Sequence, residues 1–196
     1  MRWLPRRAVW LAGAVPLALL VADMLADRLG PDPVVAIEHR LGRTALYFII
    51  ASLCVTPLLR LGRLNLIRFR RTLGLLAFSY ATLHVLAWAV LDLGLLWAQI
   101  LRDVVKRPYL IVGASAFVIL AILAATSADS MIRRLGAGRW KALHRSIYAG
   151  VLLAILHWIW AYKLPPAKAL AVGAGVAVIL ALRLPVVDRA VRALRK

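Results

Sequence analysis

The chain alternates between long apolar runs and short polar segments. Six of the runs approach or exceed the roughly 20 residues that a helix needs to cross a bilayer. Helices satisfy their own backbone hydrogen bonds, which lipid cannot do, so each run is expected to be helical. The predicted spanning helices cover residues 8–25, 44–59, 72–97, 109–126, 141–162 and 169–184. This pattern predicts an all-α integral membrane protein, a six-helix transmembrane bundle that forms one domain over residues 1–196.

Two segments near the N-terminus affect this assignment. The first 25 residues are basic and then apolar, as in a signal peptide, but they lack a clear small-residue cleavage site. Their apolar part is also long for a signal sequence, so we interpret it as the first spanning helix. The polar stretch 26–43 contains Pro31 and Pro33 and is interpreted as a loop.

Charge predicts an orientation rather than a nucleic-acid partner. The net charge is +18 and 63% of the residues are hydrophobic, but the charges cluster between the apolar runs. One side of the bundle, with both termini and segments 60–71 and 129–145, collects 18 Lys and Arg residues against Asp129 and Asp188. The other side has 8 Lys and Arg residues against six acidic ones. This bias predicts that both termini are cytoplasmic, with the basic residues contacting membrane lipid.

Three of the four histidines fall inside predicted spans, where ionisable side chains are costly and usually functional. His84 lies 13 residues after Arg71, and His157 lies 13 residues after His144. Each interval is about 20 Å of helix, and the two helices are predicted to run in parallel. His84 and His157 should therefore lie at similar depth toward the outer side. Neutral imidazole is a standard axial ligand of heme iron, so the pair predicts a bis-histidine heme b.

His144 is a candidate ligand of a second heme nearer the cytoplasmic side. The matching positions on helix 72–97 hold Arg70 and Arg71 instead of histidine, so an arginine there would pair with a propionate or a water. However, 13 residues place His144 and His157 about 140° apart around an ideal helix. Unless the helix tilts or contains a π-bulge near Gly150, one of the two is not a ligand.

Less specific interpretations remain open for these residues. A membrane histidine can simply hydrogen-bond between helices, and His39, expected in the loop beside Glu38, suits a structural or surface role. We find no glycine-rich phosphate loop, dinucleotide fingerprint or Ser-His-Asp arrangement, so electrons would come from a separate donor or from quinol. Basic residues on the cytoplasmic side could attract an acidic donor protein or a phosphate-bearing flavin, or only bind lipid and fix topology. They are Arg63, Arg68, Arg133, Arg134 and Arg139.

Several stretches together resemble the MsrQ (YedZ) family, within the ferric reductase-like transmembrane family. Their order, spacing and placement on helices agree over nearly the whole chain. They are HRLGRTAL (39–46), TPL (56–58), IRFRRTLGLLAFSYATLH (67–84), KRPYL (106–110), TS (126–127) and LGAGRWKALHRSIYAGVLLAILHWIW (135–160).

The resemblance implies a function. Members of this family are heme-bearing subunits in the bacterial inner membrane, and they also carry FMN. They pass electrons from the quinone pool or a cytosolic flavin reductase to MsrP, a periplasmic molybdopterin enzyme that reduces methionine sulfoxide in oxidised proteins. The resemblance carries the heme ligands over to His84, His157 and His144, and it places Arg70 where two-heme relatives have histidine. It implies no catalytic residue on this chain, since reduction of methionine sulfoxide would occur on the partner.

Two other functions stay open from the sequence. The first is a stand-alone transmembrane heme protein that reduces metal ions or quinones. The second is a heme-free transporter or assembly factor whose histidines serve packing or proton transfer. A proton relay would lack obvious carboxylates, because the predicted spans carry few acidic residues.

Overall fold

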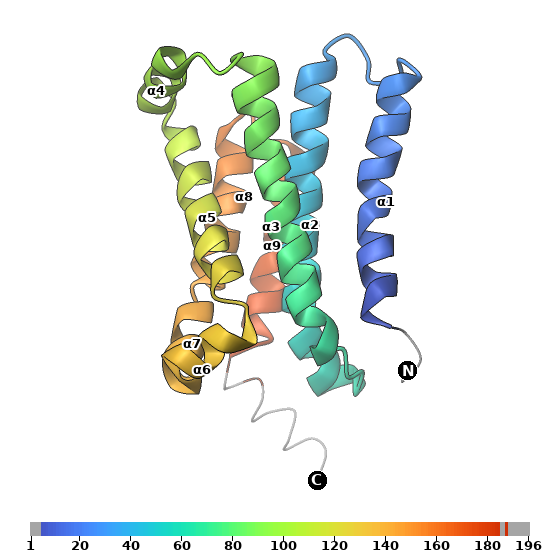
Figure 1. Cartoon of the computed structure of the whole chain (residues 1–196), viewed down its shortest axis with the longest axis vertical. Helices are drawn as coiled ribbons and strands as arrows, with labels where there is room; N and C mark the ends of the chain where they lie inside the picture. Colours follow the sequence, from blue (N-terminus) through green and yellow to red (C-terminus); the bar gives the residue numbers. More distant parts are fainter. Residues whose placement is uncertain (1–4, 185–186, 188–196) are drawn as a thin grey trace.

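A computed structural model describes residues 5–184 and Val187, and these contain helices and turns but no strand. The long helices stand side by side, with α1 at one edge and α5 toward the other (Figure 1). Short helices lie across the two ends of the bundle. The helices are α1 (Arg6–Leu25), α2 (Pro33–Gly62), η1 (Ile67–Phe69), α3 (Arg70–Ala87), η2 (Trp88–Asp92), α4 (Trp97–Lys106), α5 (Pro108–Ala125), α6 (Asp129–Leu135), α7 (Ala137–His144), α8 (Ile147–Trp160) and α9 (Ala167–Ala181).

The two ends of the bundle are named here after their short helices. The α4 end carries α4 and the turn between α1 and α2, and the α7 end carries η1, α6 and α7 (Figure 1). Within the described residues, five helical segments are long and apolar enough to cross a membrane: 7–25, 33–62, 67–92, 108–125 and 137–160. The sixth predicted span coincides with α9, which has 15 residues and is shorter than the usual spanning length. The all-helical prediction is confirmed, while six spans and the orientation stay predictions.

Helix α2 begins well before the predicted start at residue 44. The Asp32 side chain caps the helix by accepting a hydrogen bond from the Val35 backbone N–H at 3.1 Å. Pro33 occupies the first turn, where its missing N–H would have had no helical partner. The loop predicted for residues 26–43 is therefore wrong from residue 33 onward. The 30 residues of α2 reach about 45 Å, so its first turns bring polar side chains to the α4 end.

Helix α3 also differs from its prediction, which ran to residue 97. It is α-helical to Ala87 and continues as the π-helical turn η2. Gly94 and Leu95 then turn the chain with positive φ angles of 55° and 59°, and α4 begins as a separate helix. Trp97, Leu101 and Val105 of α4 are exposed, as expected for an apolar helix face at the edge of a membrane.

The core lies where α2 and α3 pack together and meet α5 and α8. Its buried side chains include Ile49, Leu53, Ala77 and Val151. Tyr80 connects this core to α1: its hydroxyl donates to the Gly13 carbonyl at 2.7 Å and accepts from the Leu17 N–H at 3.0 Å. These backbone groups are four residues apart, so the hydroxyl is inserted into the hydrogen-bond ladder of α1.

Candidate functional site

A cavity of about 480 Å³ lies inside the α4 end, between α2, α3, α5 and α8. His84 from α3 and His157 from α8 both line it. Their ring centroids are 6.3 Å apart and their planes are inclined by 70°. The depth argument from the sequence is confirmed to this extent: the two histidines lie at the same level and face one space.

Both imidazole rings are oriented by backbone carbonyls. His84 Nδ1 lies 2.9 Å from the Glu38 carbonyl oxygen, and His157 Nδ1 lies 2.7 Å from that of Tyr109. A carbonyl oxygen only accepts, so Nδ1 carries the proton in each ring and Nε2 keeps its lone pair. Metal-bound histidines usually donate their other ring N–H to such an acceptor. Each ring is therefore in the tautomer that a metal ligand requires.

The pair fits an axially ligated iron better than a bare metal ion. A metal–imidazole nitrogen bond is about 2 Å, so rings separated by 6.3 Å leave room for one metal atom between them. No group of three or more His, Cys, Asp or Glu side chains among the described residues could hold a metal ion. Two protein ligands suffice only where a macrocycle supplies the others, as in heme. The residues present thus fit a heme group.

Two glycines make the histidine positions possible. An added Cβ at Gly113 of α5 would lie 2.6 Å from His157 Nδ1, which is shorter than any ordinary contact. An added Cβ at Gly42 of α2 would lie 3.3 Å from two atoms of the His84 ring, a tight contact. The rings therefore pack directly against helix backbone. Neither glycine was predicted to contact a histidine, although a glycine inside a spanning helix is a signal of such a close approach.

Charged residues line part of the cavity. Arg43 of α2 lines it and forms no hydrogen bond or ion pair among the described residues. Arg107 also lines it and lies 3.5 Å from Asp103. The carboxyl group of Glu38 has one buried oxygen, Oε1, without a hydrogen-bond partner. Arg43, which the sequence analysis did not single out, is therefore the cation available to an anion in the cavity.

His39 does not lie in a loop, as the sequence suggested. It belongs to α2 and lines the cavity. The Tyr162 hydroxyl is 3.4 Å from both of its ring nitrogens, and the ring centroids are 5.7 Å apart. The loop prediction failed because Pro33 begins the helix rather than interrupting it. A tyrosine contact is consistent with a structural role for this histidine.

His144 lies apart from the other two, at the α7 end. The expected continuous helix 141–162 is broken: α7 ends at His144 and α8 begins at Ile147. The 140° separation calculated for one ideal helix therefore does not apply, and no π-bulge occurs near Gly150. The His144 ring stacks on Trp140 at 3.9 Å between centroids, and Nδ1 donates to the Trp140 carbonyl at 3.1 Å. Its Nε2 is buried without a hydrogen-bond partner.

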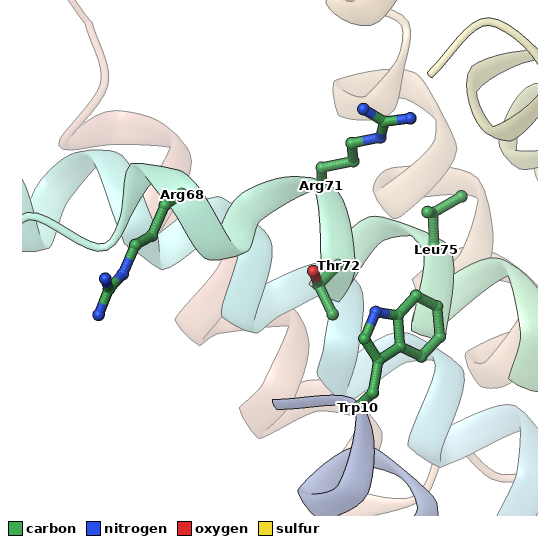
Figure 2. A pocket seen from close by; sticks show the side chains of 5 residues that line it. All are labelled: Trp10, Arg68, Arg71, Thr72 and Leu75. Atoms are coloured by element: carbon green, nitrogen blue, oxygen red, sulfur yellow. The ribbon is translucent and has the colours of Figure 1, made fainter. Parts of the chain in front are cut away.

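The two arginines predicted beside His144 have different surroundings. Arg70 is close enough to His144 to act on it electrostatically. Arg71 instead forms an ion pair with Asp129 of α6 at 2.9 Å. It also borders a hollow of about 140 Å³ with Arg68, Thr72, Leu75 and Trp10. Figure 2 shows the Arg71 and Arg68 side chains pointing in different directions. Their cofactor roles stay predictions.

Comparison with known proteins gives consistent matches. Residues 41–155 match the family "Ferric reductase like transmembrane component". A Ralstonia nicotianae protein is 45% identical over 91% of this chain and 83% of its own length. Proteins of Xanthomonas oryzae pv. oryzae and Herminiimonas arsenicoxydans are 46% and 44% identical, each over 78% of this chain and 72% and 70% of their own lengths. All three are named protein-methionine-sulfoxide reductase heme-binding subunit MsrQ.

Proposed function

Because the chain belongs to the ferric reductase-like transmembrane family, and within it to the MsrQ family, we propose that it is a heme-binding electron-transfer subunit of a methionine sulfoxide reductase. The observation that carries the proposal is the pair His84 and His157, with both Nδ1–H groups bonded to carbonyls and both Nε2 atoms available. A bound heme b would supply an iron that gains and loses one electron at a time.

The described residues have separate roles in this proposal. His84 and His157 hold the iron, and the carbonyls of Glu38 and Tyr109 keep the two rings in place. Arg43 would bind a propionate, because it lines the cavity and forms no hydrogen bond or ion pair among the described residues. The apolar walls from α3, α5 and α8 exclude water from the electron carrier. The cavity lies at the α4 end, which the charge bias predicts to face the periplasm.

The proposed electron acceptor is a periplasmic molybdopterin reductase of the MsrP type. The donor is the quinone pool or a cytosolic flavin reductase, and FMN is proposed as a further cofactor on the strength of the family resemblance. A second heme at His144, near Arg70, extends the same proposal toward the cytoplasmic side. The protein is expected in the bacterial inner membrane, where both sides of such a chain are accessible.

The proposed function is tested by following the heme during electron transfer. The purified protein, reduced anaerobically, should be reoxidised when an MsrP-type partner and methionine sulfoxide are both added. Omitting either component should leave the heme reduced, and the measurement is the reduced α-band against time. Reoxidation by ferric chelates or quinone alone, without any response to the partner, would favour the stand-alone reductase. A colourless protein after heme-replete expression would contradict both heme functions.

The role of Arg43 gives a second prediction. Changing Arg43 to Gln should weaken heme retention several-fold, because a propionate would lose its charge-assisted partner. The heme potential should also fall, since removing a nearby positive charge disfavours the added electron. Heme loss to apomyoglobin and a redox titration would measure the two effects. Arg102→Gln is the matched control, because Arg102 lies on the exposed surface of α4. If both variants lost heme at the same rate and had the same heme potential, Arg43 would not contact the heme.

A further inference from the structure

Arginines from three separate elements converge at the α7 end, opposite the heme cavity. Arg60 lies in the last turn of α2, Arg70 begins α3, and Arg183 follows α9 by two residues. These helix ends all lie at the α7 end of the bundle (Figure 1), and the positive charges of Arg60 and Arg70 both bear on the Arg183 guanidinium. We call these residues the arginine cluster.

Arg183 is held in the middle of this cluster by two uncharged side chains. Its Nη2 donates a hydrogen bond to the Thr56 hydroxyl of α2 at 2.6 Å. Its Cζ lies 5.3 Å from the centroid of the Tyr148 ring of α8, in cation–π contact. Side chains from two helices thus fix the guanidinium between them, although neither one neutralises it.

The positive charge of Arg183 has no counter-charge among the described residues. Its Nη1 atom is buried and makes no hydrogen bond, and neither Arg183 nor Arg70 forms an ion pair there. Burial lowers the pKa of the Arg183 guanidinium, the Tyr148 side chain raises it, and the charges of Arg70 and Arg60 lower it. A partly buried cation surrounded by like charges is costly unless an anion joins it.

We propose that the arginine cluster binds a phosphate group, with Arg183 as its central ligand and Thr56 and Arg70 beside it. A phosphate ester offers several oxygens and up to two negative charges, so it can accept from more than one guanidinium at once. A carboxylate has two oxygens and one charge and would leave the cluster positive. The Thr56 hydroxyl accepts from Arg183 and can donate its own proton to a phosphate oxygen.

The position of the cluster is compatible with two sources of phosphate. The cluster lies at helix ends, which is the level of phospholipid headgroups for a chain that spans the membrane. It also faces the side that the charge bias predicts to be cytoplasmic, where soluble phosphate-bearing molecules such as flavin nucleotides occur. The recognition chemistry is the same in both cases. The site does not depend on the proposed heme, because it shares no residue with the His84–His157 cavity.

Paired ligands that differ only in phosphate distinguish these sources. The full-length protein, purified in detergent and delipidated, is titrated with FMN and with riboflavin, and flavin fluorescence is followed. In parallel, it is titrated with a short-chain phosphatidylglycerol and with the diacylglycerol of the same chains, and tryptophan fluorescence is followed during thermal unfolding. One phosphate ligand should bind at least tenfold more tightly than its phosphate-free counterpart. The ligand that does so identifies the source.

Variants then locate the binding. Arg183→Gln should weaken the phosphate ligand roughly 10- to 100-fold, the usual effect of losing a charged hydrogen bond. Thr56→Val keeps every charge and should weaken binding of the phosphate ligand several-fold. This variant provides the test if Arg183→Gln does not fold. Arg134→Gln, on the exposed surface of α6, is the matched control and should change affinity less than twofold.

Four results would overturn the proposal. The first is equal binding of the phosphate and phosphate-free ligands, and the second is equal binding by Arg183→Gln or Thr56→Val and the control. The third is a loss of heme in Arg183→Gln, which would assign the cluster to a heme carboxylate near His144. The fourth is a gain of affinity in Asp188→Asn. Asp188 lies outside the described residues, and such a gain would make its carboxylate the resident anion.

Discussion

Replacing His84 or His157 by alanine should remove most of the b-type absorption of the purified protein. Both side chains line the cavity, and their rings lie 6.3 Å apart, so each would supply one of the two imidazole ligands of the iron. Losing a partner that merely orients a metal ligand already costs about 10- to 100-fold in affinity, so losing the ligand itself should cost more. The heme-to-protein ratio and the low-spin Soret and α-bands measure the effect.

The control for this experiment comes from the same cavity. His39 also lines it, but within the described structure its ring nitrogens lie 3.4 Å from the Tyr162 hydroxyl and hold no backbone carbonyl, so His39→Ala should keep the heme. His144→Ala should leave the His84–His157 heme intact and lower the heme-to-protein ratio only if a second heme is present. Low-spin spectra that survive both His84→Ala and His157→Ala would show that the heme is held elsewhere.

Changing Gly113 to alanine should also cause a large loss of heme, although no ligand is removed. The new Cβ would lie 2.6 Å from His157 Nδ1 and 2.8 Å from Cε1. The ring cannot move away without breaking its hydrogen bond to Tyr109, which lies one turn earlier on the same helix. The added methyl group would therefore displace the His157 ring, which would hold the iron, and the heme-to-protein ratio measures the result.

A graded series of glycines separates this steric effect from a general effect on the helices. Gly42→Ala should reduce the heme content less, because its Cβ would meet the His84 ring at 3.3 Å. Gly74→Ala should not reduce it, since nothing lies within 4 Å of that position on α3. Alanine favours a helix over glycine by about 1 kcal/mol, so Gly74→Ala should be as stable as the parent or more so. Similar heme contents in all three variants would show that the rings do not depend on backbone contact.

The sequence predicts the histidine pair because the depth of a residue along a spanning helix depends only on the helical rise. The 13-residue intervals gave equal depths for His84 and His157, and the structure brings the two rings together. The same reasoning failed where local chemistry changes the helix. Asp32 and Pro33 begin α2 early, and the chain bends at Arg145–Ser146, which invalidates angles calculated along one continuous helix.

Other parts of the site depend on contacts that leave no pattern in the sequence. The acceptors for the two histidines are backbone carbonyls, so residue type does not reveal them. Arg43 belongs to the stretch 26–43 that the sequence predicts as a loop, and it reaches the cavity wall because α2 begins at Pro33. Arg183 lay at the edge of the last predicted helix, and its contact with Thr56 joins residues 127 positions apart. Such long-range contacts form only when the helices pack.

The carbonyl anchors of His84 and His157 have a consequence for how this protein can vary. A backbone oxygen is present whatever side chain its residue bears, so substitutions at positions 38 and 109 leave both anchors in place as long as α2 and α5 stay helical. The Glu38 side chain, with its unpartnered Oε1, can therefore change without disturbing the ligand that its own carbonyl orients. Substitutions at positions 38 and 109 can therefore change the polarity around the iron without changing how His84 and His157 are held.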